Sequence, residues 1–412
     1  MTKQVINTGT VANDGTGDGL RTAFTKVNSN FNELYTVIGG SVPPTPNIAY
    51  TGIFGNEPSY WVFTEPKKLL QTSNNTFSNT SNMYWLDQKF DDQYYDLSAL
   101  VTIKFNNIGG CTNYIDFSDK AELALQSIDY GNLEYIQQSF YLSGFTGGIL
   151  RSVTANNLYF VGEYLEMYGN GFIDGPNIVF PKLETIGINL YLDYNSNYNG
   201  MSNTACPAFP ALKNIGDSFY IYQNNFKSYP VFTSLTNINN SLNFYNNSGD
   251  GGASYSGPGF PALTKVNSNL SMYNNWNMTD VPEFTNLLTV KYWVQFFNCN
   301  ALTTFPSFPV LTNIYYAGIE SYDCPAMTSV GAFLPSIKQI NGDVNFQNCA
   351  LDEVSIDLIL TRLASLDGTN GTTNYEYKNI YLNGGTNSIP SATGLAAKSV
   401  LESRGCNVYV NS

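Results

Sequence analysis

The sequence has no histidine, few charged residues and no long apolar run, and each absence removes a class of function. With no histidine among 412 residues, a cysteine–histidine zinc site is excluded, and acid–base chemistry would depend on carboxylates. The net charge is −13, and the sequence has no run of basic residues that could neutralise nucleic-acid phosphates. No stretch approaches the ~18 apolar residues typical of a membrane span, and no secretion signal follows Met1. We therefore expect neither a nucleic-acid partner nor membrane insertion.

Sequence motifs for catalysis and cofactor binding are also missing. The Gly-x-Ser-x-Gly motif and the phosphate loop do not occur, and the six cysteines form no Cys-x-x-Cys pair. We expect no enzymatic activity, no cofactor and no metal. The abundance of tyrosine, with 30 residues, and of Asn, Ser and Thr indicates instead an uncharged, rigid extracellular surface.

A short apolar pattern recurs from about Leu165 to Leu351. Its last copy is Val344-Asn345-Phe346-Gln347-Asn348-Cys349-Ala350-Leu351, in which two alternating apolar residues precede a cysteine and a leucine. Successive Asn or Cys anchors are 23 to 29 residues apart, and a fixed period of this size is typical of a solenoid. The anchors are Asn170, Asn195, Asn224, Asn247, Asn275, Cys299, Cys324 and Cys349.

A second apolar motif precedes the first in each copy from Phe180 onward. It reads Phe-Pro-x-Leu-x-x-Ile/Val, and Phe232 and Phe284 keep its apolar positions without the proline. The combined pattern resembles the leucine-rich repeat, which implies short strands with two apolar residues facing the core and a buried Asn or Cys at the following turn. We expect a leucine-rich-repeat-like β-solenoid of short parallel strands with few helices. The full motif begins at Phe180, Phe209, Phe260 and Phe308.

Three cysteines fall at the anchor position of successive copies. Cys299, Cys324 and Cys349 are 25 residues apart, which places them on turns roughly 5 Å apart. A disulfide or a metal site is geometrically conceivable at this spacing. Cysteine is also a small, readily buried residue suited to this turn, and we predict that all three are buried free thiols.

Composition and periodicity divide the chain into five segments. The repeats are regular from Leu165 and irregular before it, and the sequence after Leu351 alternates two helical patterns with two strand patterns. Terminal segments of a solenoid are expected to cover its open ends. The predicted segments are an attachment and oligomerisation module (1–40), a linker (41–47), an N-terminal cap (48–100), the solenoid (101–351) and an α/β C-terminal cap (352–412).

A heptad pattern near the N-terminus predicts a helix with one apolar seam. The apolar residues are spaced 4, 3, 4, 3 and 4, after Asp18 and before Gly39 and Gly40. Fewer than three heptads is short for an independent coiled coil, so the helix either trimerises with help from the rest of the chain or docks on a partner. The seam contains Leu20, Phe24, Val27, Phe31, Leu34 and Ile38.

The stretch from Asn13 to Tyr35 resembles a short N-terminal module of tailed-bacteriophage virion proteins, found in T4-like phages and phages of cyanobacteria. The resemblance covers about residues 5–38. It implies that residues 5–38 contact other virion proteins. It also implies that the protein is part of the phage particle, which is assembled in the host cytoplasm. It does not distinguish baseplate, neck, tail and head. With the heptad seam, it leads us to expect a homotrimer.

In each repeat, the residue after the second apolar strand residue is expected to be exposed. These residues, one from each repeat, form a column that is mainly aromatic. The neighbouring exposed column is mainly polar and contains Glu166, Tyr191, Tyr220, Asn243, Ser271, Gln295, Glu320 and Asn345. Aromatic rings beside amides and hydroxyls suit a host-surface glycan or protein. The alternative is that the rings merely stabilise the stacked strands. The column contains Tyr168, Asp193, Tyr222, Tyr245, Tyr273, Phe297, Tyr322 and Gln347, and its aromatic members are the candidate binding residues.

Glu166 and Asp193 are the candidate pair for an enzymatic alternative. They lie on adjacent repeats with a two-residue offset, which places their backbones roughly 8 Å apart, a separation compatible with an inverting glycosidase.

We expect a structural virion protein, a fibre or receptor-binding component. The alternatives are a capsule-degrading tailspike glycosidase and a purely architectural baseplate, neck or head decoration.

Overall fold

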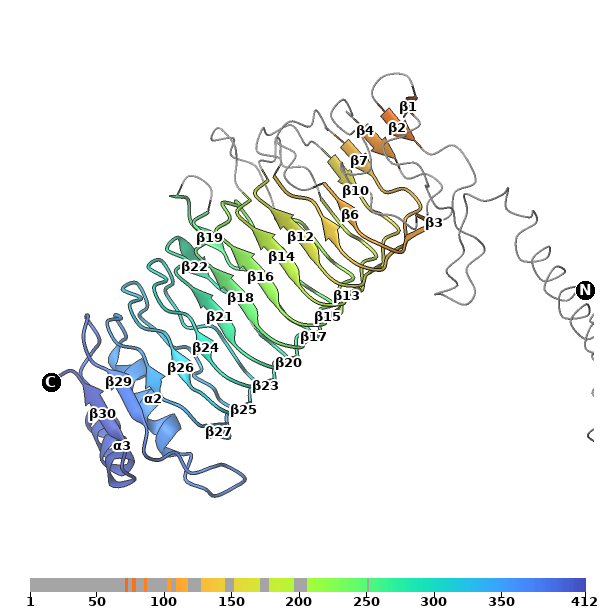
Figure 1. The fold of residues 1–412 in the computed structure, drawn as a ribbon. Coiled ribbons are helices and arrows are strands. Elements are labelled where there is room, and N and C mark those ends of the chain that lie inside the picture. Colours follow the sequence, from red (N-terminus) through yellow and green to blue (C-terminus); the bar gives the residue numbers. More distant parts are fainter. Residues whose placement is uncertain are drawn as a thin grey trace, which may run out of the picture.

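The structure, a computed structural model, shows a parallel β-solenoid of about 11 turns. It describes residues 71–72, 76–78, 85–86, 102–104, 109–117, 127–144, 152–170, 178–195, 206–249, 252–282 and 284–412. Successive turns lie side by side along the solenoid, and the two helices found among the described residues lie at its C-terminal end (Figure 1). The predicted N-terminal helix and the linker 41–47 lie outside the described residues.

One long sheet is built from the strands that the alternating apolar pattern predicts. All its strand pairs are parallel and in register, for example Leu190 with Phe219 and Leu192 with Ile221. The 12-stranded sheet contains, in chain order, β6 (Ile115–Asp116), β9 (Phe140–Tyr141), β12 (Leu165–Tyr168), β14 (Leu190–Asp193), β16 (Phe219–Tyr222), β18 (Leu242–Tyr245), β21 (Leu270–Tyr273), β24 (Val294–Gln295), β26 (Ile319–Glu320), β28 (Val344–Asn345), β29 (Asn379–Leu382) and β30 (Asn407–Val410).

A second long sheet, which the repeat pattern did not predict, is formed where each Phe-Pro-x-Leu-x-x-Ile/Val motif ends. Its strands have only two residues, too few to show a period of two, and from the strand at Tyr135–Ile136 onward one of the two is buried in each. The 11-stranded sheet contains β3 (Trp85–Leu86), β5 (Gly110–Cys111), β8 (Tyr135–Ile136), β11 (Phe160–Val161), β13 (Thr185–Ile186), β15 (Asn214–Ile215), β17 (Asn237–Ile238), β20 (Lys265–Val266), β23 (Thr289–Val290), β25 (Asn313–Ile314) and β27 (Gln339–Ile340).

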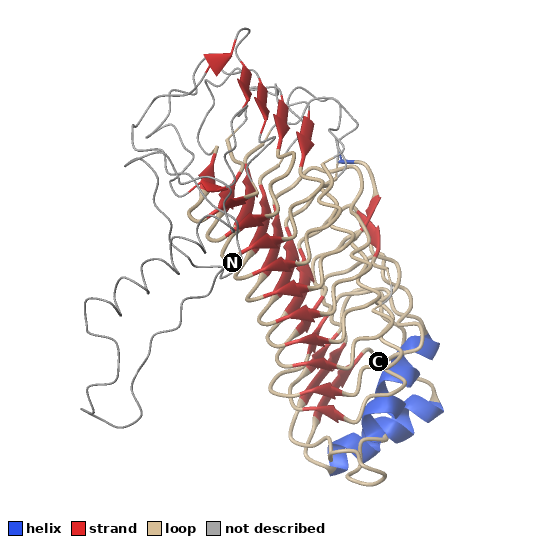
Figure 2. Ribbon diagram, turned by 90° about the vertical axis from the view of Figure 1, so that its right-hand side faces the viewer, coloured by secondary structure: helices blue, strands red, loops and turns tan. Residues whose placement is uncertain are grey.

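Shorter sheets occupy a third side of the solenoid (Figure 2). A five-stranded sheet contains β1 (Gln71–Thr72), β2 (Thr76–Ser78), β4 (Thr102–Lys104), β7 (Ser127–Asp129) and β10 (Ser152–Thr154), and a two-stranded sheet contains β19 (Tyr255–Ser256) and β22 (Met278–Asp280). Strands β1, β2 and β3 belong to the segment 48–100, so the sheets begin before residue 101.

After the last repeat the chain forms the two helices and two strands that the sequence predicts there. Helix α2 (Glu353–Ala364) begins after Asp352, whose side chain accepts a hydrogen bond from the Ser355 N–H. Helix α3 (Ala392–Ser403) begins after Ser391. The two helices pack together, and β29 and β30 extend the 12-stranded sheet. Neither of these helices, nor any other in the described part of the chain, has the length and apolarity of a membrane span.

A column of stacked phenylalanines fills the solenoid interior. Phe260 lies between Phe232 and Phe284, with ring centroids 5.1 and 5.7 Å away and nearly parallel planes. Its side chain is completely buried. The repeating motif therefore places one aromatic ring above the next in the core. The column contains Phe180, Phe209, Phe232, Phe260, Phe284 and Phe308.

The anchor residues form a buried hydrogen-bonded ladder after the 12-stranded sheet. The side chain of Asn195 donates to Asn224 Oδ1 at 3.1 Å and to the Met167 carbonyl oxygen at 2.8 Å. Cys324 donates its thiol to the Phe296 carbonyl oxygen at 3.0 Å. Cys299, Cys324 and Cys349 are all buried and free, which confirms that prediction. Each turn thus satisfies backbone groups of the turn before it.

Glycines at the corner between the two long sheets allow close backbone contact. A Cβ added to Gly187 would lie 1.8 Å from the carbonyl oxygen of Gly162, and one on Gly216 would lie 1.8 Å from that of Gly187. No side chain fits at this distance. From Asn239 onward the same corner carries larger residues, including Lys291 and Tyr315.

Candidate binding surface on the 12-stranded sheet

The predicted aromatic column is a continuous surface stack over five turns. Tyr222, Tyr245 and Tyr273 are register partners on β16, β18 and β21. The successive centroid distances from Tyr222 to Tyr322 are 4.4, 5.1, 4.6 and 4.8 Å, with planes within 21° of parallel. The core-facing partners are fully buried as predicted, namely Ile221, Phe244, Met272, Phe296 and Ser321.

Tyr194 fills the gap that sequence reasoning left at Asp193, through a tilted contact with Tyr168 and an edge-on contact with Tyr222. Its ring lies 5.0 Å from that of Tyr168 and 4.9 Å from that of Tyr222. Tyr194 has φ 55°, and the residue before every later anchor up to Cys349 also has a positive φ. The turn therefore directs the residue before the anchor back over the sheet. In the sequence, the signal for this ring was an aromatic residue directly before the anchor Asn195.

The stacked rings expose their edges and hydroxyl groups rather than their faces. From Tyr222 to Tyr322 all the column rings are half-buried, whereas Tyr168 at the end of the column is exposed. Each interior ring has a neighbour on both faces at van der Waals distance. A ligand therefore meets a row of ring edges and phenol groups, which act as hydrogen-bond donors and acceptors.

The phenol groups of Tyr194, Tyr245, Tyr273 and Tyr322 remain neutral over a wide pH range. Burial, followed by the neighbouring Tyr273, raises the pKa of Tyr245 to about 12. A hydrogen bond with Tyr222 and, to a smaller extent, burial raise the pKa of Tyr194 to about 12. Burial also raises the pKa of Tyr273 and of Tyr322. The surface therefore offers uncharged hydroxyl groups at any physiological pH.

A row of polar side chains runs beside the aromatic column. The Ser271 hydroxyl donates to Gln295 at 2.7 Å, and the Gln295 amide donates to Glu320 at 2.7 Å. The prediction that Ser271 is exposed is wrong, because its small side chain lies beneath this hydrogen bond and is only 2% exposed. Tyr191 and Tyr220 stack in the same row at 4.9 Å.

Asp193 and Glu166 lie near each other at the N-terminal part of this surface, as predicted. Glu166 is the register partner of Tyr191, and Tyr168 that of Asp193, which produces the two-residue offset. Burial and, to a smaller extent, the negative charge of the Glu166 carboxylate raise the pKa of Asp193 to about 7. One Asp193 carboxylate oxygen is buried without a hydrogen-bond partner. A carboxyl group poised near neutrality can donate or accept a proton.

The described part of the chain contains no cluster of three or more acidic or cysteine side chains arranged to hold a metal ion. The six predicted attachment residues lie outside the described residues, so their mutual arrangement stays a prediction. They are Leu20, Phe24, Val27, Phe31, Leu34 and Ile38.

Comparison with known proteins shows which family the N-terminal part of the chain is similar to. Residues 3–124 match the family described as "Bacteriophage T4 gp9/10-like protein, N-terminal". The match confirms the resemblance to T4-like phage virion proteins and extends well past residue 38. Searches of curated proteins and of solved structures gave no significant match.

Proposed function

We propose that this T4-like phage virion protein is a tail or fibre component whose aromatic column, Tyr168 to Tyr322 with Tyr194, recognises the host surface. One observation carries the proposal. An unbroken row of stacked rings from Tyr222 to Tyr322, of which all but Phe297 carry a phenol hydroxyl, lies on an exposed sheet face beside amide and carboxylate side chains. Such a row can form hydrogen bonds to the hydroxyls of a glycan or to the edge of a protein.

The protein acts by binding rather than by catalysis in this proposal, and it needs no cofactor.

A glycosidase is the second candidate function. The Asp193 carboxyl and its neighbour Glu166 are the groups that such an enzyme would use, and the pKa of about 7 at Asp193 is the observation that favours it. Release of reducing sugars from host polysaccharide by the purified protein, lost in Asp193→Asn, would establish the enzymatic alternative.

The solenoid is of leucine-rich-repeat-like type in this proposal, and its two ends are covered by caps. At the C-terminal end, helix α2 buries Ile356, Ile359 and Leu360 against the core while β29 and β30 continue the 12-stranded sheet. Helix α2 thereby covers apolar core that the open end of the solenoid would otherwise expose. The segment 48–100 has the corresponding role at the other end.

Residues 5–38 attach the chain to other virion proteins and trimerise it in this proposal, which rests on the family match and on the heptad seam. Three copies on one particle would multiply weak contacts with a host surface. Replacing both Phe24 and Phe31 with Asp should abolish incorporation into particles while the thermal melt of the solenoid is unchanged. Normal incorporation of this variant would contradict the role of the seam.

The recognition surface is tested by a triple alanine variant at Tyr222, Tyr245 and Tyr273. We expect adsorption of phage to host cells to fall by about tenfold or more, because multivalent attachment amplifies each weakened contact. The matched control replaces the same three residues with Phe, which retains the ring stack and removes the hydroxyls. If hydroxyls carry recognition, the Phe variant keeps its melting temperature and also loses adsorption. Unchanged adsorption in the alanine variant would make the column purely structural.

A further inference from the structure

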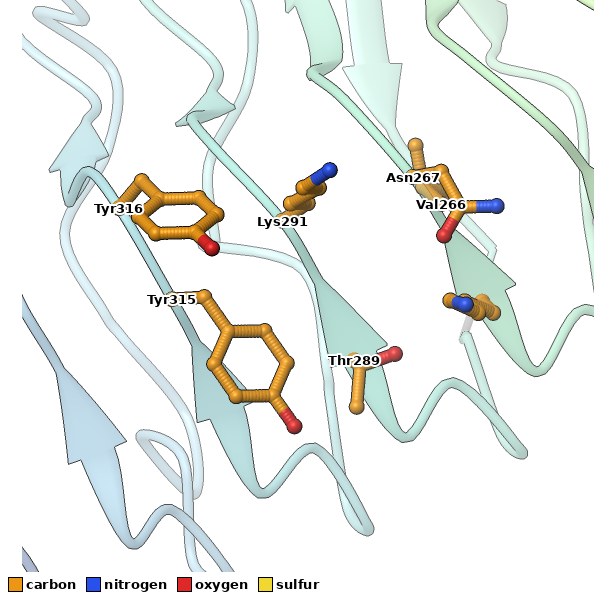
Figure 3. Close-up of a pocket in the computed structure, with 7 residues that line it drawn as sticks. Val266, Asn267, Thr289, Lys291, Tyr315 and Tyr316 are labelled. Carbon is orange, nitrogen blue, oxygen red and sulfur yellow. The ribbon is translucent and has the colours of Figure 1, made fainter.

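A second candidate site lies outside the aromatic column, at the corner of the solenoid where strands of the 11-stranded sheet end. Three successive turns form a shallow hollow of about 250 Å³ there. We call it the corner site. Figure 3 shows the side chains of Thr289, Lys291, Tyr315 and Tyr316 beside one another on neighbouring turns. It is lined by Lys265, Val266, Asn267, Thr289, Lys291, Tyr315 and Tyr316.

Strand register brings the polar side chains of the corner site together. Lys265 on β20 pairs with Thr289 on β23, and Thr289 pairs with Asn313 on β25. The buried side chain of Val266 points into the core, so its neighbours Lys265 and Asn267 project outward. Lys291 follows β23 in the same way. The ammonium groups, an amide and a hydroxyl thus face one hollow.

The two lysines are unusual in a chain with a net charge of −13. Both are exposed, and neither forms an ion pair or side-chain hydrogen bond with any residue that the structure describes. Lys213 on the same side of the solenoid provides the contrast, since its Nζ lies 2.8 Å from Glu184 Oε1. The corner site therefore concentrates positive charge that the surrounding surface does not neutralise.

One tyrosine of the corner site, Tyr316, is more exposed than any ring of the aromatic column. Tyr316 is 65% exposed, and its ring is tilted by 41° from that of Tyr292. The Lys291 Nζ lies 5.8 Å from the Tyr316 centroid and 6.0 Å from that of Tyr292. This contact holds the ammonium group beside a ring on which a flat, partly apolar ligand can lie.

We propose that the corner site binds a saccharide that carries an anionic group. The charge would lie against Lys265 and Lys291, the hydroxyls against Asn267 and Thr289, and the ring on Tyr316. The hollow of about 250 Å³ is smaller than the ~300–1,000 Å³ of drug-sized pockets. It fits a single sugar ring, and its openness across three turns lets a polymer continue on both sides.

Titration of the full chain with defined probes tests this proposal by calorimetry and by saturation-transfer NMR. The carboxylate probe is tetragalacturonic acid, with its methyl ester as the neutral match. The phosphate probe is glucose 6-phosphate, and tetraglutamate represents an acidic peptide. We expect one of the anionic sugars to bind while the methyl ester does not. The sugar that binds distinguishes a carboxylate from a phosphate as the recognised charge.

Variants at the corner site give the second arm of the test. Lys265→Gln and Lys291→Gln should each weaken binding by about tenfold, because each removes one charge-assisted contact. Tyr316→Ala should weaken binding, and Tyr316→Phe should not. Lys213→Gln is the matched control and should leave binding unchanged, and all these exposed substitutions should leave the melt unchanged. Absence of binding by both anionic sugars, equal binding of tetraglutamate, or equal losses in Lys213→Gln would overturn the proposal.

Discussion

Two aromatic stacks run along this solenoid with nearly the same spacing, and they differ in what surrounds them. The phenylalanine column in the core has centroid distances of 5.1 to 6.3 Å, and the surface column from Tyr222 to Tyr322 has distances of 4.4 to 5.1 Å. Both follow from the register of parallel turns ~4.8 Å apart. The core rings are at least 98% buried, whereas the surface rings are half-buried.

This difference shows that ring stacking alone is no evidence for binding. A repeat with an aromatic residue at any fixed position will stack its rings, because each turn lies directly on the one before. The evidence for function comes from the groups that remain accessible. In the surface column these are edges and hydroxyls, and in the corner site they are a ring face and two ammonium groups.

The largest effect is expected in the core stack. Phe260→Ala should lower the free energy of unfolding by about 3–5 kcal/mol, because it opens a cavity between Phe232 and Phe284. Chemical denaturation followed by circular dichroism measures this loss. Phe260→Leu is the control that retains most of the volume and should cost clearly less. An alanine variant as stable as the parent chain would show that the stack contributes little to stability.

Asp193, the acidic residue within the surface column, should reduce stability as the pH rises. Its pKa of about 7 in the folded chain lies above the ~3.9 of an unfolded chain, so folding favours the protonated form. Stability therefore falls as pH rises from about 4 to about 7 and is level beyond that.

Asp193→Asn removes this pH dependence. We expect it to stabilise the chain by about 2–4 kcal/mol at pH 8 and by almost nothing at pH 4. Denaturant unfolding at pH 4, 6 and 8 measures the difference between the two proteins. Asp280→Asn, at an exposed carboxylate, is the control. A constant difference between Asp193→Asn and the parent chain at all three pH values would exclude the proposed titration.

The solenoid and its core could be predicted from the sequence because strands such as Leu190–Asp193 are long enough to show alternation, and because the Phe and Asn anchors recur at recognisable spacings. The 11-stranded sheet could not, since a strand such as Thr185–Ile186 carries no period. The corner site also escaped prediction. Its residues come from three turns, and their register depends on loops of unequal length between anchors.

The candidate site was predictable only in outline. The column positions follow from the strand alternation, and the register confirms them. The covering of each ring face by the next ring, and the insertion of Tyr194, depend on the turn after each strand. The positive φ of that turn has no signature in apolar periodicity, because residues as different as Tyr194, Gln223 and Asp323 adopt it.

The smallest effect is expected where the surface stack is interrupted at one ring. Tyr245→Ala removes stacking on Tyr222 and Tyr273 at 4.4 and 5.1 Å, and aromatic pairs contribute ~0.5–1.5 kcal/mol each beyond burial. Because the ring is half-exposed and its neighbours can close over the gap, we expect a loss of only about 1–2 kcal/mol. Tyr245→Phe should cost almost nothing, since Phe297 already occupies the same position two turns later. Denaturant unfolding of both variants beside Phe260→Ala gives the comparison directly. A loss in Tyr245→Ala as large as that in Phe260→Ala would mean that the surface stack is part of the core, and the argument that its exposed hydroxyls are free for recognition would then fail.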